Sequence, residues 1–221
     1  MVANELISNV VPVLKKSDTC LQALSWMEIF RVSHLPLVNE EVYLGLVADE
    51  LIYAHGDLSD PIEALNVPSE GTFVHEDYHI YDVIRLASSR LLSVVPVLNR
   101  EGNFVGSIVL TDILHKLDLL LGVDEPGGII VLEMNRLDYS LAEVARIVEY
   151  NEARILSCCV NSIKDSRLMQ LTIKVNVADI NPLLDAFIRY GYTIKDSFVA
   201  GEEERDSVKE RYGLLMKYLS V

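Results

Sequence analysis

An internal repeat is the feature that most constrains the fold of this chain. The stretch SHLPLVNEEVYLGLVADEL, from Ser33 to Leu51, is echoed by SVVPVLNREGNFVGSIVLTDIL, from Ser93 to Leu114. The copies are 60 positions apart at Ser33 and Ser93 but 61 apart at Gly45 and Gly106, so the second copy is one residue longer. An insertion of this size fits in a turn between two strands at little cost. A fixed period therefore indicates two structural repeats that pack together.

Each repeat has the pattern of a β-α-β-β-α unit. A short β-type segment is followed by a helix with apolar residues at helical spacing, and then by two apolar strands and a closing helix. In the first copy we expect the opening segment at 10–14, the strands at 35–38 and 43–47, and the closing helix at 50–54. In the second copy the matching ranges are 72–75, 94–98, 104–110 and 111–120.

This repeat, with its h-P-h-h-N and G-h-h-…-D-h-h patterns, resembles the CBS domain. The tandem pair resembles a Bateman module, with one repeat at 1–57 and the other at 58–122. The resemblance implies that an adenosine-containing ligand, AMP, ADP, ATP or S-adenosylmethionine, binds in the cleft between the repeats. It also implies a regulatory protein and not an enzyme.

The resemblance also indicates which residues bind. The family pattern G-h-h-T-x-[ST]-D falls on Gly106 to Asp112, where the Asp and the adjacent hydroxyl are kept but Val109 replaces the first Thr. An Asp there accepts hydrogen bonds from ribose hydroxyls, and donors at a helix N-terminus attract phosphate. We expect the ligand to meet Asp112, Thr111, Thr72, Ser93, Val94, Val95 and Arg90.

The first repeat keeps less of this pattern. Its matching stretch, Gly45 to Leu51, lacks the final Asp and both hydroxyls, so we expect at most one competent site. Residues 1–122 carry seven Lys and Arg against seventeen Asp and Glu, which favours adenosine, AMP or a sulfonium ligand over free ATP unless Mg²⁺ offsets the charge. The alternative is that Thr111 and Asp112 only cap a helix and that the chain is an interaction scaffold.

The second half has the order of a ferredoxin-like fold, β-α-β-β-α-β, so the whole chain is predicted to be of the α/β (α+β) class. A linker at 123–128 precedes this domain at 129–198, and a C-terminal helix is expected at 202–219. The domain resembles the ACT domain, as in acetoin-utilisation-type regulatory proteins. The usual Gly before the first helix is missing, because Tyr139 stands there, so dimerisation is favoured over amino-acid sensing.

The stretch HEDYH, His75 to His79, matches the H-E-x-x-H signature of zinc peptidases. The repeat register instead places it at a strand end, a turn and a helix start, where the first copy reads KKSDT. We expect Asp77, like Ser17 in the first copy, to cap the helix that follows. No metal site and no catalytic residue is therefore predicted.

Composition excludes several other classes of function. The formal net charge is −14, and no cluster of Lys and Arg is present that would bind nucleic acid. No apolar run is long enough for a membrane span, and no signal peptide is recognised, so we expect a cytoplasmic protein. The thiols of Cys20, Cys158 and Cys159 are expected to be reduced. The apolar content of 50% favours a homodimer, with an unidentified regulated protein as a further partner.

Overall fold

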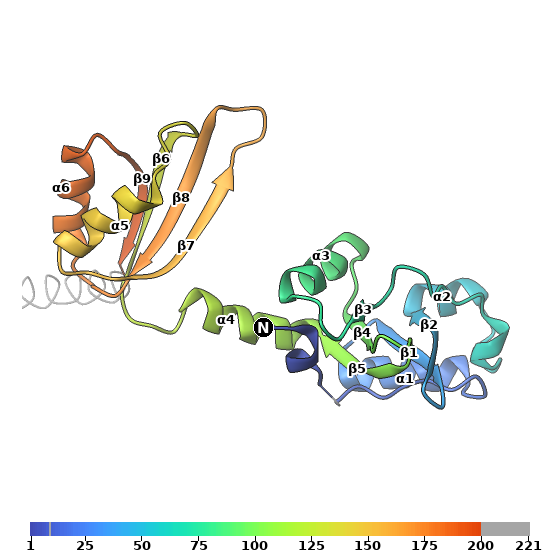
Figure 1. Cartoon of the computed structure of the whole chain (residues 1–221). Helices are drawn as coiled ribbons and strands as arrows, with labels where there is room; N and C mark the ends of the chain where they lie inside the picture. Colours follow the sequence, from blue (N-terminus) through green and yellow to red (C-terminus); the bar gives the residue numbers. More distant parts are fainter. Residues whose placement is uncertain (9, 200–221) are drawn as a thin grey trace, which may run out of the picture. The chain divides into compact units, whose positions relative to one another are not determined.

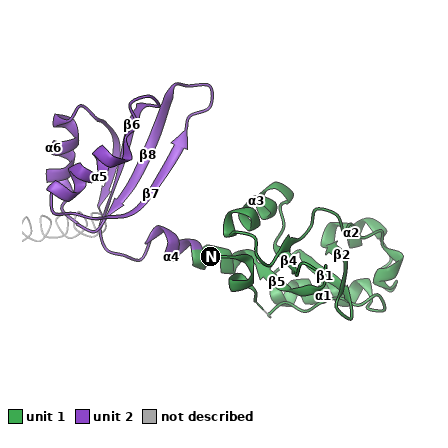
Figure 2. Ribbon diagram, viewed as in Figure 1, with its two compact units in different colours: residues 1–116 green, residues 117–221 purple. Residues whose placement is uncertain are grey.

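The computed structural model describes residues 1–8 and 10–199 (Figure 1). The chain forms two compact units, Met1–Lys116 and Leu117–Val221 (Figure 2). The division falls within a helix, and not at the turn 123–128 that the sequence indicates. The expected helix at 202–219 lies outside the described residues. In the described residues, no helix is both long and apolar enough to cross a bilayer.

The first unit confirms the predicted repeats. The first repeat contains α1 (Cys20–Phe30), β1 (His34–Asn39), β2 (Val42–Ala48) and α2 (Asp49–His55), flanked by 3-10 turns at Ala3–Leu6 and Ile62–Ala64. The second contains β3 (Val74–His75), α3 (Ile80–Arg90), β4 (Val94–Leu98), β5 (Phe104–Val109) and α4 (Leu110–Leu121). The opening strand expected at 10–14 is reduced to a single parallel bridge between Leu14 and Leu37.

The α1 and α3 helices of the two repeats end in the same backbone conformation. Arg31 is the C-cap of α1 and Leu91 is the C-cap of α3, and both residues are left-handed with φ of 54°. A left-handed residue closes a helix by exposing its N–H to the last carbonyl groups. Neither residue is glycine, and a left-handed conformation is unfavourable for other residues. Both copies therefore have the same small backbone strain at the turn into the following strand.

A short segment precedes the first strand of each repeat and packs on the other repeat. We call these the lead-in segments; they contain Ile7 and Ser8 in the first copy, and Val67 and Pro68 in the second. Before the first repeat, Ser8 N donates to Ser107 O of the second repeat at 2.8 Å. Before the second repeat, Pro68 O accepts from Leu46 N of the first repeat at 3.0 Å. Each lead-in thus lies on the last strand of the other copy. The two copies therefore fold as one unit.

Glycine makes this exchange possible, because each lead-in lies where a Cβ atom would otherwise be. A Cβ on Gly45 would lie 2.7 Å from Pro68 O and 2.7 Å from Val67 Cγ1, and a Cβ on Gly106 would lie 2.4 Å from Ile7 Cγ2. Ordinary carbon contacts begin well beyond these distances. The repeated glycines of the sequence pattern are therefore required by chain packing.

The second unit has the predicted ferredoxin-like order. It contains β6 (Gly128–Asn135), α5 (Leu141–Tyr150), β7 (Ile155–Ser162), β8 (Leu168–Val175), α6 (Asn181–Arg189) and β9 (Thr193–Val199). The strands form one antiparallel sheet in the order β7-β8-β6-β9.

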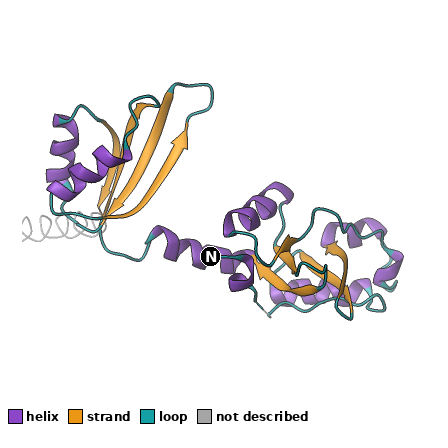
Figure 3. Ribbon diagram, viewed as in Figure 1, coloured by secondary structure: helices purple, strands orange, loops and turns teal. Residues whose placement is uncertain are grey.

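One face of this sheet is covered by both helices (Figure 3). Burial alternates along β8, whose Met169, Leu171, Ile173 and Val175 lie in the core. Cys158 packs against the same core whereas Cys159 is exposed, as expected for neighbours on a strand.

Replacing Gly45 by Ala tests the exchange of lead-in segments. The added methyl group must displace the Pro68 carbonyl, so we expect the first unit to lose about 1–3 kcal/mol of unfolding free energy. Denaturant unfolding followed by the fluorescence of Trp26, the single tryptophan, reports on this unit. Gly102→Asn is the control, because Gly102 has open space around it and Asn tolerates its left-handed conformation. Equal midpoints for the two variants contradict the expected clash.

Candidate functional site

Two of the expected ligand residues lie at the start of α4. Thr111 is exposed and Asp112 is half-buried, and both lie in the first turn of this helix. The helix begins at Leu110, whose N–H donates to Ser93 O at 3.1 Å. The first turn of α4 is therefore held beside the first residues of β4.

The start of β4 has one main-chain edge that pairs with no strand in the described residues. The whole of β4 pairs with β5, but in the described residues it pairs with β3 only at Val97 and Leu98. Val94 and Val95 are buried as whole residues, main chain included, at 0% and 1% exposure. The unpaired backbone groups on this side of β4 are therefore covered by neighbouring atoms of the chain.

Thr72 lies in the approach to β3 and is 7% exposed. Its hydroxyl donates to Ser69 O at 2.8 Å, so Tyr43 Oη, 2.7 Å away, must be the donor to Thr72 Oγ1. Burial raises the pKa of Tyr43 to about 12, which keeps this donor protonated. Tyr43 was not identified from the sequence, although the repeat register aligns it with Phe104, which has no hydroxyl.

Arg90 is exposed at the end of α3, and its guanidinium reaches the residue before Thr72. Its Nη2 lies 3.2 Å from the position that a Cβ on Gly71 would take. Gly71 has a φ of +66°, which favours glycine. The structure thus brings Arg90 and the Thr72 segment together.

Ser93 is bonded to the first repeat. Its Oγ accepts from Ser33 N at 2.9 Å and lies 3.1 Å from His34 Nδ1. Ser93 N donates to His34 Nδ1 at 3.3 Å. The Ser93 side chain is therefore part of the junction between the two repeats.

The HEDYH stretch lies at a turn, but its capping residue differs from the prediction. The α3 helix begins at Ile80, and His79 is its N-cap, with Nδ1 accepting from Tyr81 N at 3.3 Å. Asp77 pairs instead with Arg100 at 2.5 Å. Thr19, and not Ser17, caps α1. The prediction was wrong because the strand end and turn extend two residues further than expected.

The imidazole of His75 is also engaged locally, since its Nδ1 lies 3.1 Å from Asn99 O. Within the ranges 1–8 and 10–199, no three His, Cys, Asp or Glu side chains gather in a way that would hold a metal ion.

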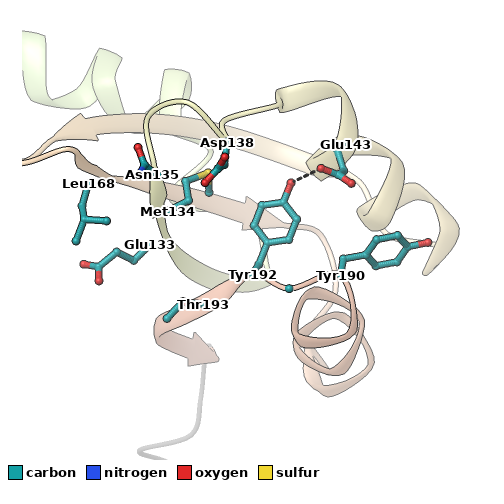
Figure 4. A pocket seen from close by; sticks show the side chains of 10 residues that line it. Glu133, Met134, Asn135, Asp138, Glu143, Leu168, Tyr190, Tyr192 and Thr193 are labelled. Atoms are coloured by element: carbon teal, nitrogen blue, oxygen red, sulfur yellow. Dashed lines mark hydrogen bonds between the residues drawn. The ribbon is translucent and has the colours of Figure 1, made fainter.

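The second unit has a cavity of about 360 Å³ beside the turn between β6 and α5 (Figure 4). Three carboxylates line it, those of Glu133, Asp138 and Glu143. Tyr192 Oη donates to Glu143 Oε2 at 2.9 Å, and burial together with this carboxylate raises the pKa of Tyr192 to about 12. Ser140 caps α5, with its Oγ accepting from Glu143 N at 3.3 Å.

Comparison with known families identifies the repeats. Residues 62–119 match the sequence model of the CBS domain, a segment that includes β3, α3, β4, β5 and most of α4. The second repeat is therefore a CBS domain. Because the first repeat has the same element order and the reciprocal lead-in, the chain carries a CBS domain pair.

A curated relative, inosine-5′-monophosphate dehydrogenase of Methanocaldococcus jannaschii, is 24% identical over 115 residues. The alignment covers 52% of this chain and 23% of that protein, so the chain spans less than a quarter of its relative.

Solved structures are also similar. The CBS domain pair/ACT domain protein of Thermotoga maritima has 22% identity over 53% of this chain and 96% of its own, with a TM-score of 0.48. A putative acetoin utilisation protein of Vibrio cholerae has 19% identity over 57% and 96%, with a TM-score of 0.48. The structure of CBSX2 in complex with AMP has 16% identity over 52% and 95%, with a TM-score of 0.46.

The contact between Tyr43 and Thr72 can be measured directly. Tyr43→Phe removes one buried hydrogen bond, so we expect the first unit to lose about 1 kcal/mol of unfolding free energy. Thr72→Val leaves the Tyr43 hydroxyl without its acceptor and should cost more, about 1–3 kcal/mol. Tyr53→Phe is the matched control, since Tyr53 is 66% exposed. In a double-mutant cycle, additive losses contradict a direct interaction.

Proposed function

We propose that the first unit is a regulatory, non-enzymatic module that binds one adenosine-containing ligand at its second repeat. The observation that carries this proposal is the position of Asp112. It lies half-buried in the first turn of α4, which is tied through Leu110 to the start of β4, where one main-chain edge pairs with no strand in the described residues. All seven expected ligand residues lie within the segment 62–119 that matches the CBS domain.

Each part of an adenosine ligand has a suitable group here. The edge of the base suits the backbone groups of Val94 and Val95, which offer directional hydrogen bonds. The Asp112 carboxylate suits the ribose hydroxyls, as an acceptor with several lone pairs. Thr111 and the first N–H groups of α4 suit a phosphate. Arg90, whose guanidinium lies beside Gly71, is the cation of the expected set.

The first repeat supports no second site of this kind. Leu51 stands at the position that matches Asp112, and its side chain packs against the core of the first repeat. Glu50 stands where Thr111 is in the second repeat and would repel phosphate. The proposed stoichiometry is one ligand for each chain, with adenosine, AMP or S-adenosylmethionine favoured over free ATP.

Calorimetric titration with adenosine, AMP, ADP, ATP, Mg²⁺-ATP and S-adenosylmethionine tests the proposal. We expect at least one to bind with a stoichiometry near one. Asp112→Asn removes a charge-assisted hydrogen bond worth about 1.5–3 kcal/mol and should weaken binding roughly tenfold to hundredfold. Glu50→Gln is the matched control, because it removes a carboxylate from the first turn of the equivalent helix α2.

Two results would count against this site. Binding that is equally weakened in both variants indicates a general effect of charge. If none of the six compounds binds, the first unit is a scaffold with a degenerate cleft.

A second candidate function lies in the cavity of the second unit. We propose that it binds a small amine, such as an amino acid with a cationic side chain. Tyr139, which replaces the expected Gly, packs against the core of this unit and is not among the residues that line the cavity. No Lys or Arg is among the lining residues either, so the three carboxylates favour a cation over an anion.

Thermal shift of the full chain with lysine, ornithine and putrescine, against glutamate as the anionic comparison, tests the second candidate. We expect the cations to raise the melting temperature, and Tyr192→Phe, which releases the Glu143 carboxylate from its hydrogen bond, to alter that shift. Tyr150→Phe, at an exposed position on α5, is the control. A shift with glutamate as large as with lysine contradicts the proposal.

The described part of the second unit also supports a role in self-association. One face of its sheet is covered by α5 and α6, while the other carries Phe198 at 56% exposure and the exposed Cys159. We propose that the chain forms a homodimer, which sedimentation of the full chain would measure.

A further inference from the structure

The junction between the two repeats is asymmetric at one position. The repeat register aligns His34, the first residue of β1, with Val94, the first residue of β4. Val94 is fully buried and packs against the core of the first repeat. At the reciprocal position His34 is half-buried and contacts Ser93 of the second repeat. One of two equivalent contacts therefore carries a group that titrates near neutral pH.

The hydrogen bonds at this junction determine the state of the ring. The backbone N–H of Ser93 can only donate, and it points at His34 Nδ1 from 3.3 Å. Nδ1 must therefore carry a lone pair, which places the proton of the neutral ring on Nε2. Ser93 Oγ, 3.1 Å from the same nitrogen, also accepts from Ser33 N, so the ring supports both the main chain and the side chain of Ser93.

Protonation of Nδ1 would remove this acceptor. The Ser93 N–H would then face another N–H, and a half-buried donor would lose its partner, at a cost comparable to a lost hydrogen bond. Burial lowers the pKa of His34, and the carboxylates of Asp49 and Glu50 at the start of α2 oppose this effect without reversing it. The other groups that face the ring are uncharged: the hydroxyl and main chain of Ser93, just before β4, and the hydroxyl of Ser33.

We propose that His34 is a positioning residue for the start of β4, and that its protonation releases Ser93 and makes the junction between the repeats sensitive to pH. Ser93 O also holds the first turn of α4 through Leu110 N, so a released Ser93 loosens the segment that presents Asp112. Acidification therefore weakens the junction itself. Its effect on ligand affinity rests, in addition, on the function proposed above.

The ligand-free chain gives the first test. His34→Asn is the informative variant, because Asn Oδ1 lies close to the position of Nδ1 and accepts from Ser93 N without titrating. Because the folded chain holds a lowered pKa, the stability that neutral His34 contributes is complete above pH 6.5 and falls as the pH drops below this value. Unfolding followed by Trp26 fluorescence should show a loss of stability between pH 7.5 and 5.5 that is smaller in His34→Asn.

His115→Asn is the control, because His115 is exposed on α4 and should leave the pH dependence unchanged. Nitrogen chemical shifts of the His34 ring in the folded chain provide a readout that does not depend on stability. We expect an unprotonated Nδ1 at pH 7.5 and a titration midpoint below 6.5. A protonated Nδ1 at pH 7.5, or the same pH dependence of unfolding in wild type and His34→Asn, would overturn the proposal.

Titration with adenosine gives the second test, because adenosine has no group that titrates between pH 5.5 and 7.5. We expect its affinity for the wild type to fall several-fold at the lower pH and its affinity for His34→Asn to change less. Equal affinities of the wild type at the two pH values overturn the link to the ligand site. Absence of adenosine binding at pH 7.5 counts against the proposed ligand and leaves the unfolding experiment to decide on the junction.

Discussion

The arrangement of the first unit depends on the exchange of its two lead-in segments. Because Val67 and Pro68 lie on the last strand of the first repeat, the chain cannot join its own sheet until Val74. The strand that follows, β3, is therefore only two residues long and leaves the start of β4 unpaired on this side. The unpaired edge at the start of β4 is thus a result of how the two copies are held together. A glycine at one position in each copy is the condition for this packing.

The two copies keep this framework and differ in the chemistry placed on it. Asp112 in the second repeat corresponds to Leu51 in the first, which has become part of the core. Tyr43 in the first repeat corresponds to Phe104 in the second, and only the tyrosine bonds Thr72 across the junction. His34 and Val94 differ in the same way. The backbone framework is nearly symmetric, whereas the side chains at these matched positions differ in chemistry.

Much of the fold could be predicted from the sequence, because strands and helices follow from local apolar patterns. The bounds of β4, Val94–Leu98, match the prediction residue by residue. Contacts between distant segments could not be found in this way. Two such contacts are the hydrogen bond between Tyr43 and Thr72 and the one between Ser8 and Ser107. Both depend on the tertiary fold, and no local sequence pattern predicts them. The asymmetry at His34 could have been found from the sequence, since aligning the two copies pairs this histidine with Val94.

The helix α4 belongs to both units, because the division of the chain falls inside it. Its first turn carries Asp112, and past its last turn the carbonyl groups of Gly122 and Val123 accept from Lys174 Nζ on β8. A helix rises about 1.5 Å for each residue and an extended chain about 3.4 Å, so unwinding one turn lengthens the connection by roughly 7 Å. Helices fray from their ends, and a ligand that orders the first turn opposes this fraying. The length of the connection between the units therefore depends on how many turns of α4 are formed.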